Sequence, residues 1–270
     1  MAALTDTGMK RSHNEDSIAS EASCGLVLVA DGMGGYRGGE IASALAANTI
    51  VYEVQHALQQ LEQNPAAMEE DEEYSSQSII MRDAICKANQ VIYQASHSLA
   101  QYQGMGTTVV AVLFLADHRL SIAHVGDSRL YRYRDDYLET ITSDHTLIQQ
   151  LIDRGFYTPE EARASMNKNL VTRALGVDAD VKVDIQEDFA QPGDIYLLCS
   201  DGLNDMIDDK DIHLTIRTYN DNLDRAAAEL IKLANANGGK DNVSVLLARI
   251  VDETHAPNKH WLDKFVDWFF

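Results

Sequence analysis

The sequence predicts an α+β fold in which β-sheets pack against each other and helices lie outside them. Two stretches with apolar residues at helical spacing, 41–61 and 79–99, precede a block of short strand-like segments. Two more strand-like segments follow this block, and after them come a helix over 224–236 and a last strand over 242–250. A chain of 270 residues with 45% apolar residues can bury a core of this kind as one large domain or two small ones.

The helices are predicted from one apolar face each, and the strands from short apolar runs between turn residues. Ile41, Leu45, Ile50 and Val54 mark the face of the first helix. The strand segments are 25–30, 107–115, 120–125, 130–133, 137–141, 181–189, 195–200 and 242–250. Turns separate the four segments between 107 and 141, which predicts an antiparallel meander there.

Two regions depart from this rhythm. Residues 144–180 hold a short helix over 146–154, a second helix start near Thr158 and a polar link, and we interpret them as an inserted flap. Residues 1–252 therefore form the predicted folded domain. Residues 253–270 form an amphipathic tail whose stripe contains Trp261, Phe265 and Trp268, and we expect it to contact a partner, a membrane surface or the protein's own surface.

The net charge of −20 argues against a nucleic-acid partner, which would require a basic surface. The three cysteines have no paired spacing, so we expect reduced thiols in a cytoplasmic protein. The first sixteen residues are too polar for a signal peptide, and no apolar run is long enough to span a bilayer.

Four aspartates lie at predicted strand boundaries: Asp31, Asp127, Asp201 and Asp241. If these strands share one end of a sheet, the four carboxylates converge, repel one another and raise one another's pKa. Mg²⁺ or Mn²⁺ resolves that conflict, because hard divalent cations prefer oxygen ligands. A protonated carboxyl pair would leave the number of acids unexplained, and His and Cys do not cluster as a zinc site requires.

Two metal ions that share a carboxylate can also share a water, whose pKa falls toward about 7. The resulting metal-bridging hydroxide can attack phosphorus in line. Such chemistry also requires a cation for the phosphoryl oxygens, and Arg11, in the polar segment 10–16, is the best candidate.

An ordered set of motifs resembles the metal-dependent protein phosphatase 2C (PPM) family, and its bacterial branch best. The motifs are Arg11-Ser12-His13-Asn14-Glu15-Asp16, Asp31-Gly32-Met33-Gly34-Gly35, Gly106-Thr107-Thr108, Val125-Gly126-Asp127-Ser128-Arg129, Ser200-Asp201-Gly202-Leu203 and Asp241-Asn242-Val243-Ser244. They run from residue 11 to residue 244, so the resemblance covers nearly the whole chain before the tail.

The resemblance implies a four-layer α/β/β/α sandwich, with two antiparallel sheets packed together and flanked by helix pairs. It implies a serine/threonine phosphatase that hydrolyses phosphoserine and phosphothreonine through the bridging hydroxide without a covalent intermediate. Its partners would be a phosphorylated protein substrate and the cognate bacterial Ser/Thr kinase system. We expect a monomer.

The resemblance also assigns roles to individual residues. Asp31 would bridge two Mn²⁺ or Mg²⁺ ions, and the Gly32 carbonyl would complete one of them. Asp201 and Asp241 would hold the other ion, and Asp127 with Asp201 a third, weaker one. Arg11 would bind the substrate phosphate. Three further residues would act behind these ligands or through metal-bound water: Glu15, Asp16 and Asn242.

Two other classes of function share these features. A pseudophosphatase would use the fold as a binding scaffold, but it has no need to keep an acid at every metal position. A structural divalent-ion binder would not need Arg11 or the flap. The sequence therefore favours the enzyme.

Overall fold

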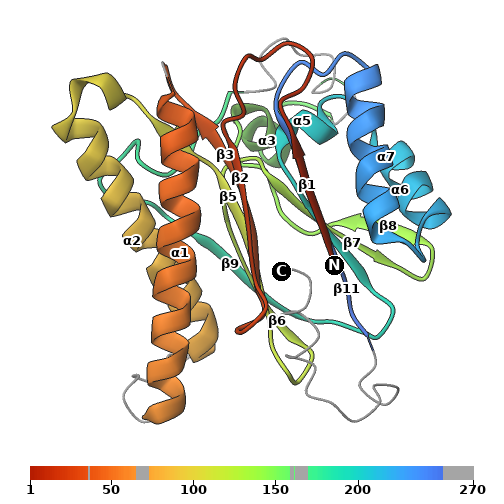
Figure 1. Ribbon diagram of the computed structural model, residues 1–270, viewed down its shortest axis with the longest axis horizontal. Coiled ribbons are helices and arrows are strands. Elements are labelled where there is room, and N and C mark those ends of the chain that lie inside the picture. The colour runs from red at the N-terminus through yellow and green to blue at the C-terminus, as the bar shows by residue number, and fades with distance from the viewer. Residues whose placement is uncertain (36, 65–72, 159–160, 162–169, 252–270) are drawn as a thin grey trace, which may run out of the picture.

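The computed structural model describes residues 1–35, 37–64, 73–158, 161 and 170–251. The chain forms two antiparallel sheets packed face to face, with helices on both outer sides (Figure 1). The predicted four-layer α/β/β/α sandwich is therefore confirmed. The predicted tail, 253–270, and part of the predicted flap lie outside the described residues.

One sheet has the strand order β2-β3-β5-β6-β9, and β4 adds to β3 beyond this path. Its strands are β2 (Asp16–Glu21), β3 (Leu26–Met33), β4 (Gly106–Thr107), β5 (Val109–Phe114), β6 (Arg119–Val125) and β9 (Asp184–Phe189). The helices α1 (Gly38–Gln63) and α2 (Ser76–Ser98) cover its outer face. Between them, Ile50, Ile85 and Ala111 are fully buried.

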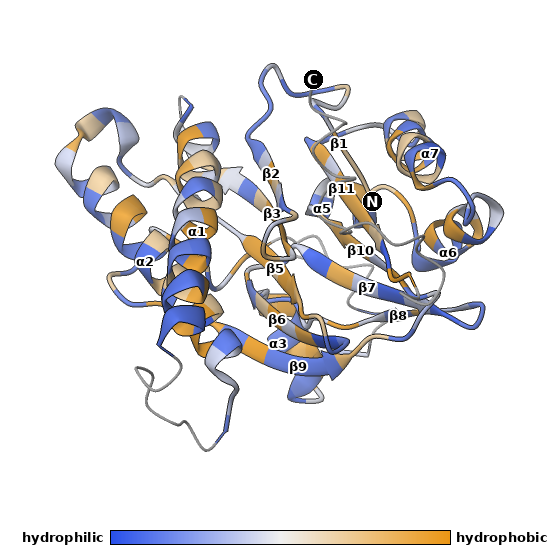
Figure 2. Ribbon diagram, turned by 60° about the horizontal axis from the view of Figure 1, so that its bottom comes forward, coloured by the Kyte–Doolittle hydropathy of each residue, from blue (hydrophilic) through white to orange (hydrophobic). Residues whose placement is uncertain are grey.

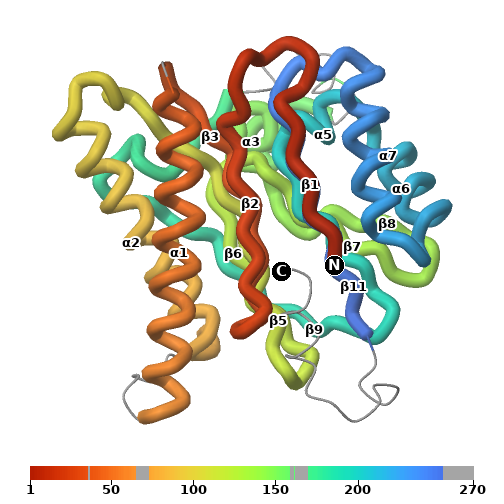
Figure 3. The backbone as a smooth tube through the Cα atoms, viewed as in Figure 1, coloured from red at the N-terminus to blue at the C-terminus, as the bar shows by residue number. Residues whose placement is uncertain are grey.

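The other sheet has the order β1-β11-β10-β7-β8. Its strands are β1 (Ala2–Asp6), β7 (Arg129–Arg134), β8 (Tyr137–Thr140), β10 (Ile195–Cys199) and β11 (Val243–Arg249). The outer helices are α6 (Asp209–Thr218) and α7 (Leu223–Ala236), which pack Ile216 and Leu230 against Leu197. Figure 3 shows the first strand running beside the last, and β1 indeed pairs with β11 in antiparallel register.

The two sheets meet through a third core that contains Val29, Val112 and Leu198. Strands buried on both faces need apolar residues throughout, and β5 and β10 are accordingly apolar along their whole length (Figure 2). The outer helices instead carry both polar and apolar residues. None of the helices in the described part of the chain combines the length and apolar character that a membrane crossing requires.

Two sequence predictions about the strands are wrong. The segments between 107 and 141 do not form one meander: β5 and β6 belong to one sheet and β7 and β8 to the other. The chain crosses between the sheets at Gly126, whose φ of +106° lies in the left-handed region that glycine tolerates best. The strand predicted over 181–189 begins only at Asp184.

The remaining elements are short. The helix α3 (Leu147–Asp153) begins after Thr146, whose hydroxyl accepts a hydrogen bond from the Gln149 amide, in agreement with the helix predicted over 146–154. A short helix, α5 (Asp201–Asn204), follows β10 directly, and a single 3₁₀ turn, η2 (Ala100–Tyr102), follows α2. The last residues of β3 and the connections after β6, after β10 and before β11 bring four aspartates to the same end of the sandwich.

Candidate metal centre

The predicted aspartates converge, but from both sheets rather than from one sheet end. Asp31 lies within β3 of one sheet. Asp201 follows β10 and Asp241 precedes β11, in the other sheet. Asp127 lies on the crossover between β6 and β7. Burial is the first cause that raises the pKa of Asp31, and the charges of Asp16, Asp201, Asp127 and Asp241 add to it, in keeping with carboxylates that meet at one end of the sandwich.

Burial and repulsion together disfavour ionisation of these groups. Burial, followed by the charge of Asp144, raises the pKa of Asp127 to about 6. Burial and the neighbouring carboxylates raise the pKa values of Asp31 and Asp201 well above their ordinary value. A cluster of this kind is unfavourable unless protons or cations neutralise it.

Asp16 is the fifth acid of the cluster and stands directly opposite Asp31 in the β2–β3 pair. Its Oδ2 accepts hydrogen bonds from the hydroxyls of Ser200 and Ser244, at 2.8 and 2.6 Å. Its Oδ1 is buried and accepts no hydrogen bond from the described residues. Burial raises the pKa of Asp16 to about 6. An orphaned carboxylate oxygen beside other carboxylates is well suited to a cation or to water bound on one.

The backbone of Asp31 is fixed by two threonines that the sequence analysis did not assign a role. Thr108 donates its amide to the Asp31 carbonyl at 2.8 Å and accepts from the Asp31 amide through Oγ1 at 3.2 Å. Thr107 Oγ1 donates to the same carbonyl at 2.8 Å. A Cβ at Gly32 would collide with the carbonyls of Gly39 and Glu15, so only glycine fits beside Asp31.

The predicted residues outside the aspartate cluster also come together there. Arg11 and Glu15 lie in the loop between β1 and β2, and Arg11 Nη2 donates to Asp241 Oδ2 at 2.6 Å. Asn242 is only 3% exposed and holds this loop at three points. It donates to the carbonyls of Thr7 and His13 at 2.9 and 2.8 Å and accepts from the Glu15 amide at 2.7 Å.

Arg11, whose Nη2 donates to Asp241, also lines a pocket of about 410 Å³. The residues that line it are Arg11, Ser12, His13, Glu15 and Arg37. The Arg11 side chain is 51% exposed, so an anionic ligand entering this pocket can reach the guanidinium. Arginine binds phosphate well because its planar group donates two parallel hydrogen bonds.

The sequence analysis missed a further acid, Asp205. Its charge raises the pKa of Asp201, after burial and the charges of Asp127 and Asp241, and it also contributes to the raised pKa of Asp127. Asp201 and Asp205 are four residues apart, so one turn of α5 places both on the same face. That spacing was visible in the sequence.

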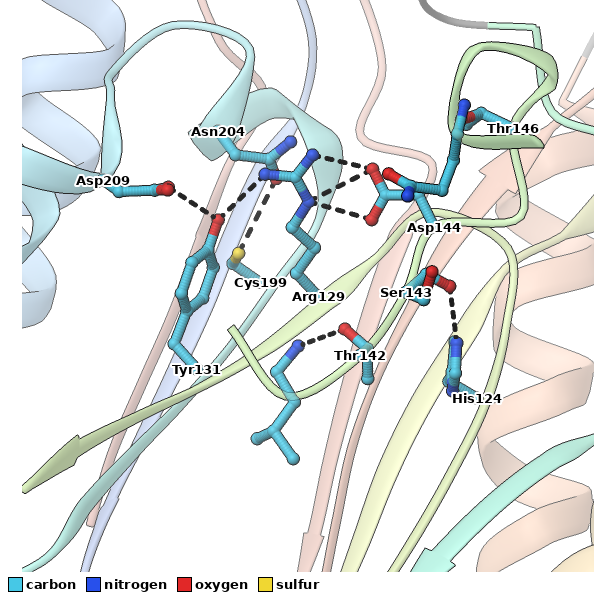
Figure 4. Close-up of polar contacts among 12 residues, drawn as sticks. His124, Arg129, Tyr131, Thr142, Ser143, Asp144, Thr146, Cys199, Asn204 and Asp209 are labelled. Atoms are coloured by element: carbon cyan, nitrogen blue, oxygen red, sulfur yellow. Dashed lines mark hydrogen bonds and ion pairs between the residues drawn. The ribbon is translucent and has the colours of Figure 1, made fainter. Parts of the chain in front are cut away.

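A separate polar network surrounds Arg129, two residues after Asp127 in the chain; Figure 4 shows the network. Arg129 binds both carboxylate oxygens of Asp144, with Nε–Oδ1 and Nη2–Oδ2 distances of 2.9 and 2.7 Å. Its Nη1 also donates to the Tyr131 hydroxyl at 3.1 Å. This ion pair anchors β7, just after Asp127, to the segment that leads into α3.

His124, His145 and Asp184 form another group whose ligand-type atoms lie within 4.8 Å of one another. Arg173 Nη1, however, lies 2.9 Å from His145 Nε2 and 2.6 Å from Asp184 Oδ1. The guanidinium thus supplies the positive charge that a metal ion would bring. Burial, helped by His124, lowers the pKa of His145 to about 4, so this imidazole is neutral at pH 7.

The donor set fits the divalent ions that the sequence predicts. Aspartate oxygens dominate it, whereas zinc sites use His and Cys. Among the described residues, however, the aspartates do not bring three ligand atoms within 4.8 Å of one another. Mg²⁺ and Mn²⁺ can be held by one or two carboxylates with water completing the shell, and Asp241 is at present hydrogen-bonded to Arg11.

Comparisons with known proteins agree with this geometry. A family profile described as "Protein phosphatase 2C" matches residues 9–247. The serine/threonine protein phosphatase PstP of Mycobacterium tuberculosis is 40% identical over 253 residues, which are 93% of this chain and 45% of PstP. The protein phosphatase PhpP of Streptococcus pneumoniae is 34% identical over 253 residues, which are 93% of this chain and 97% of PhpP.

Solved structures show the same similarity. The crystal structure of the M. tuberculosis phosphatase superposes with a TM-score of 0.79 at 37% identity, covering 93% of this chain and 98% of that one. A second structure of the PstP catalytic domain, described as a complex with two manganese ions, gives a TM-score of 0.73 at 38% identity, with 93% and 97% coverage.

Proposed function

Because the chain belongs to the protein phosphatase 2C family, we propose that it is a protein serine/threonine phosphatase that hydrolyses phosphoserine and phosphothreonine. The observation that carries this proposal is the convergence of Asp31, Asp127, Asp201 and Asp241 beside a pocket that Arg11 lines. The names of the relatives support the same activity. The chain spans less than half of the PstP chain, so activities of the remainder of PstP are not transferred.

The carboxylates have the chemistry to hold two to three Mn²⁺ or Mg²⁺ ions. Asp31 would be shared between two ions, with the Gly32 carbonyl on one of them and Asp201 and Asp241 on the other. Asp127 with Asp201 would hold the third. When bound, such ions activate water for direct attack on phosphorus, with no covalent enzyme intermediate.

The protein's own residues prepare the substrate. Arg11 would bind the phosphoryl oxygens and orient the phosphorus toward the carboxylate cluster. Asn242 would set the position of Arg11 and Glu15, because it holds the loop that carries both. Asp16 would orient the site through its free Oδ1, since its other oxygen is held by Ser200 and Ser244.

Hydrolysis of p-nitrophenyl phosphate with Mn²⁺, with and without chelator, tests the proposal. We expect turnover that the chelator abolishes and that added Mn²⁺ restores. If folded protein shows no metal-dependent turnover, the pseudophosphatase becomes the better description. Turnover that persists in Asp31→Ala would instead overturn the site assignment.

Partners and setting follow from the same proposal. The natural substrate would be a protein phosphorylated by a cognate bacterial Ser/Thr kinase, and the enzyme would act as a cytoplasmic monomer. Cys24, Cys86 and Cys199 are not joined in disulfides. A phosphoproteome comparison with and without active enzyme would identify the substrate, and light scattering would determine the oligomeric state.

Tryptophan fluorescence can test what the predicted tail, residues 253–270, contacts. The chain has two tryptophans, Trp261 and Trp268, and both lie in the tail. Intrinsic tryptophan fluorescence therefore reports on the tail alone. A blue shift upon addition of anionic vesicles would indicate a membrane contact, and a blue-shifted spectrum without any addition would indicate contact with the protein's own surface.

A further inference from the structure

The crossover that carries Asp127 has a backbone that cannot rearrange freely. It comprises Gly126, Asp127 and Ser128, between the end of β6 and the start of β7. A Cβ at Gly126 would collide with the side chain of Thr108, and the φ of this glycine is +106°. Asp127 itself is 7% exposed. The direction of its carboxylate therefore depends on what holds the Gly126 peptide.

His145 forms hydrogen bonds with both backbone polar groups of Gly126, the carbonyl and the amide. The His145 amide donates to the Gly126 carbonyl at 2.9 Å. The Gly126 amide donates to His145 Nδ1 at 3.0 Å. Accepting this hydrogen bond requires an unprotonated Nδ1. The other ring nitrogen, Nε2, lies 3.1 Å from Asp184 Oδ2 and 2.9 Å from Arg173 Nη1, so these two side chains fix the orientation of the ring.

The neighbours of His145 hold the rest of the same turn. Thr142 Oγ1 accepts from the Leu130 amide at 3.1 Å, and the Ser143 carbonyl accepts from His124 Nε2 at 2.9 Å (Figure 4). Asp144 binds Arg129. Each residue from 142 to 145 thus bonds to a residue between 124 and 130, and His145 is the one that bonds to the crossover itself.

His145 also anchors the far end of the predicted flap. Its carbonyl accepts from the Thr172 amide at 2.8 Å and from Thr172 Oγ1 at 3.0 Å. Arg173 continues the attachment by donating to Asp184 Oδ1 at 2.6 Å. One histidine therefore joins the start of the flap, its return and the crossover that carries Asp127.

From these contacts we propose that His145 is a positioning residue that fixes the Gly126 peptide and thereby the carboxylate of Asp127. Its role as part of a metal centre rests on the proposed function, but the contact with Gly126 does not. His145 touches neither substrate nor metal in this proposal. Residues that orient metal ligands from behind typically change metal affinity or activity about 10- to 100-fold when they are removed.

Two substitutions separate this role from simple packing. His145→Leu fills similar space but cannot accept the Gly126 hydrogen bond. In His145→Asn the Oδ1 atom can occupy roughly the position of Nδ1 and accept it. His213→Leu, at a histidine on α6 that bonds to the Asp136 carbonyl, is the matched control for loss of an imidazole.

The first measurement is the rate of amide hydrogen exchange at Gly126 in the full chain. NMR detects the exchange, and chelator is present throughout. We expect exchange in His145→Leu to be at least about tenfold faster than in the wild type, and exchange in His145→Asn to be close to the wild type. Equal exchange in all variants would overturn the proposed contact.

The second measurement is calorimetric titration with Mn²⁺ alone. We expect the weakest site of His145→Leu to lose about tenfold or more in affinity, with the tighter sites retained, and His145→Asn to recover most of the loss. Equal losses in both variants would show that His145 acts by packing only, and the proposal would be wrong. Neither measurement depends on hydrolysis. The role of His145 can therefore be tested even if the protein is not a phosphatase.

Discussion

Arg11 Nη2 lies 2.6 Å from Asp241 Oδ2, so the guanidinium proposed to bind substrate is paired with a carboxylate proposed to bind metal. The two side chains are 51% and 34% exposed. The pair is consequently weak, in the range of about 0–1 kcal/mol that surface ion pairs contribute. It can open when a metal ion or a phosphate offers a better partner.

Arg11→Ala should therefore separate substrate binding from metal binding. Loss of charge-assisted hydrogen bonds worth about 1.5–3 kcal/mol should raise KM for a phosphopeptide roughly 10- to 100-fold. Mn²⁺ affinity should stay the same or rise by up to about fivefold, because Asp241 is released. Steady-state kinetics and Mn²⁺ calorimetry measure the two effects. Arg37→Ala, in the same pocket, should leave Mn²⁺ affinity unchanged, and weaker Mn²⁺ binding by Arg11→Ala would contradict this account.

Asn242→Ala should destabilise the protein and weaken substrate binding together. The substitution leaves the carbonyls of Thr7 and His13 and the amide of Glu15 without their hydrogen-bond partner. We therefore expect the free energy of unfolding to fall by about 2–4 kcal/mol. Urea unfolding measures the first effect and the KM of the surviving folded protein the second. The exposed Asn220→Ala should change stability by less than about 0.5 kcal/mol. A variant as stable as the wild type would refute the role of Asn242.

The ion pair of Asp194 and Arg134, which lies outside the candidate metal centre, should make the stability of the fold depend on pH. Asp194 Oδ1 and Oδ2 accept from Arg134 Nε and Nη2 at 2.8 and 2.6 Å. Burial alone would raise the pKa of Asp194, but Arg134 brings it below the ordinary value. A lowered folded-state pKa means that the stabilisation is complete above about pH 4 and is lost as pH falls through the folded value.

Asp194→Asn should accordingly lower the free energy of unfolding by about 3–5 kcal/mol at pH 7, because it breaks a buried pair. The difference from the wild type should shrink below about pH 4. Chemical unfolding across this range measures both. The exposed pair of Asp117 and Arg119 provides the control, since Asp117→Asn should have little effect. A difference that grows at low pH would contradict the assignment.

Asp127→Asn should stabilise the metal-free protein while weakening metal binding. The folded pKa of Asp127, about 6, lies above its unfolded value of about 3.9, so ionisation costs stability as pH rises between the two. In chelator at pH 7.5 the variant should be more stable by roughly 1–3 kcal/mol. Added Mn²⁺ should raise the Tm of the wild type more than that of the variant. A variant less stable than the wild type in chelator would count against the cluster.

The sequence predicted the parts of the fold whose signals are local. The long amphipathic helices and the fully apolar strands were predicted within a few residues. The strands β1 and β2 were missed because these edge strands are short and only partly buried, and β2 is largely polar. The helix α6 was missed although Ile212 and Ile216 have helical spacing and Asp208 caps it.

The site was predictable in its chemistry but not in its geometry. Acids beside glycines at strand boundaries indicated a metal centre, and the motif order indicated the family. Nothing local indicated that Asp31 and Asp201 belong to different sheets, because sheet membership depends on the crossover at Gly126. The contact of His145 with Gly126 joins residues nineteen positions apart and has no periodic signature.

The central claim is that Asp31 belongs to a metal centre that performs the hydrolysis. The most direct test is the rate of phosphopeptide hydrolysis as a function of Mn²⁺ concentration in the wild type, Asp31→Asn and the remote control Asp224→Asn. We predict saturable Mn²⁺ dependence in the wild type and the control, and a rate at least about 100-fold lower in Asp31→Asn at every Mn²⁺ concentration. An Asp31→Asn variant with wild-type turnover and the same Mn²⁺ dependence would contradict the account.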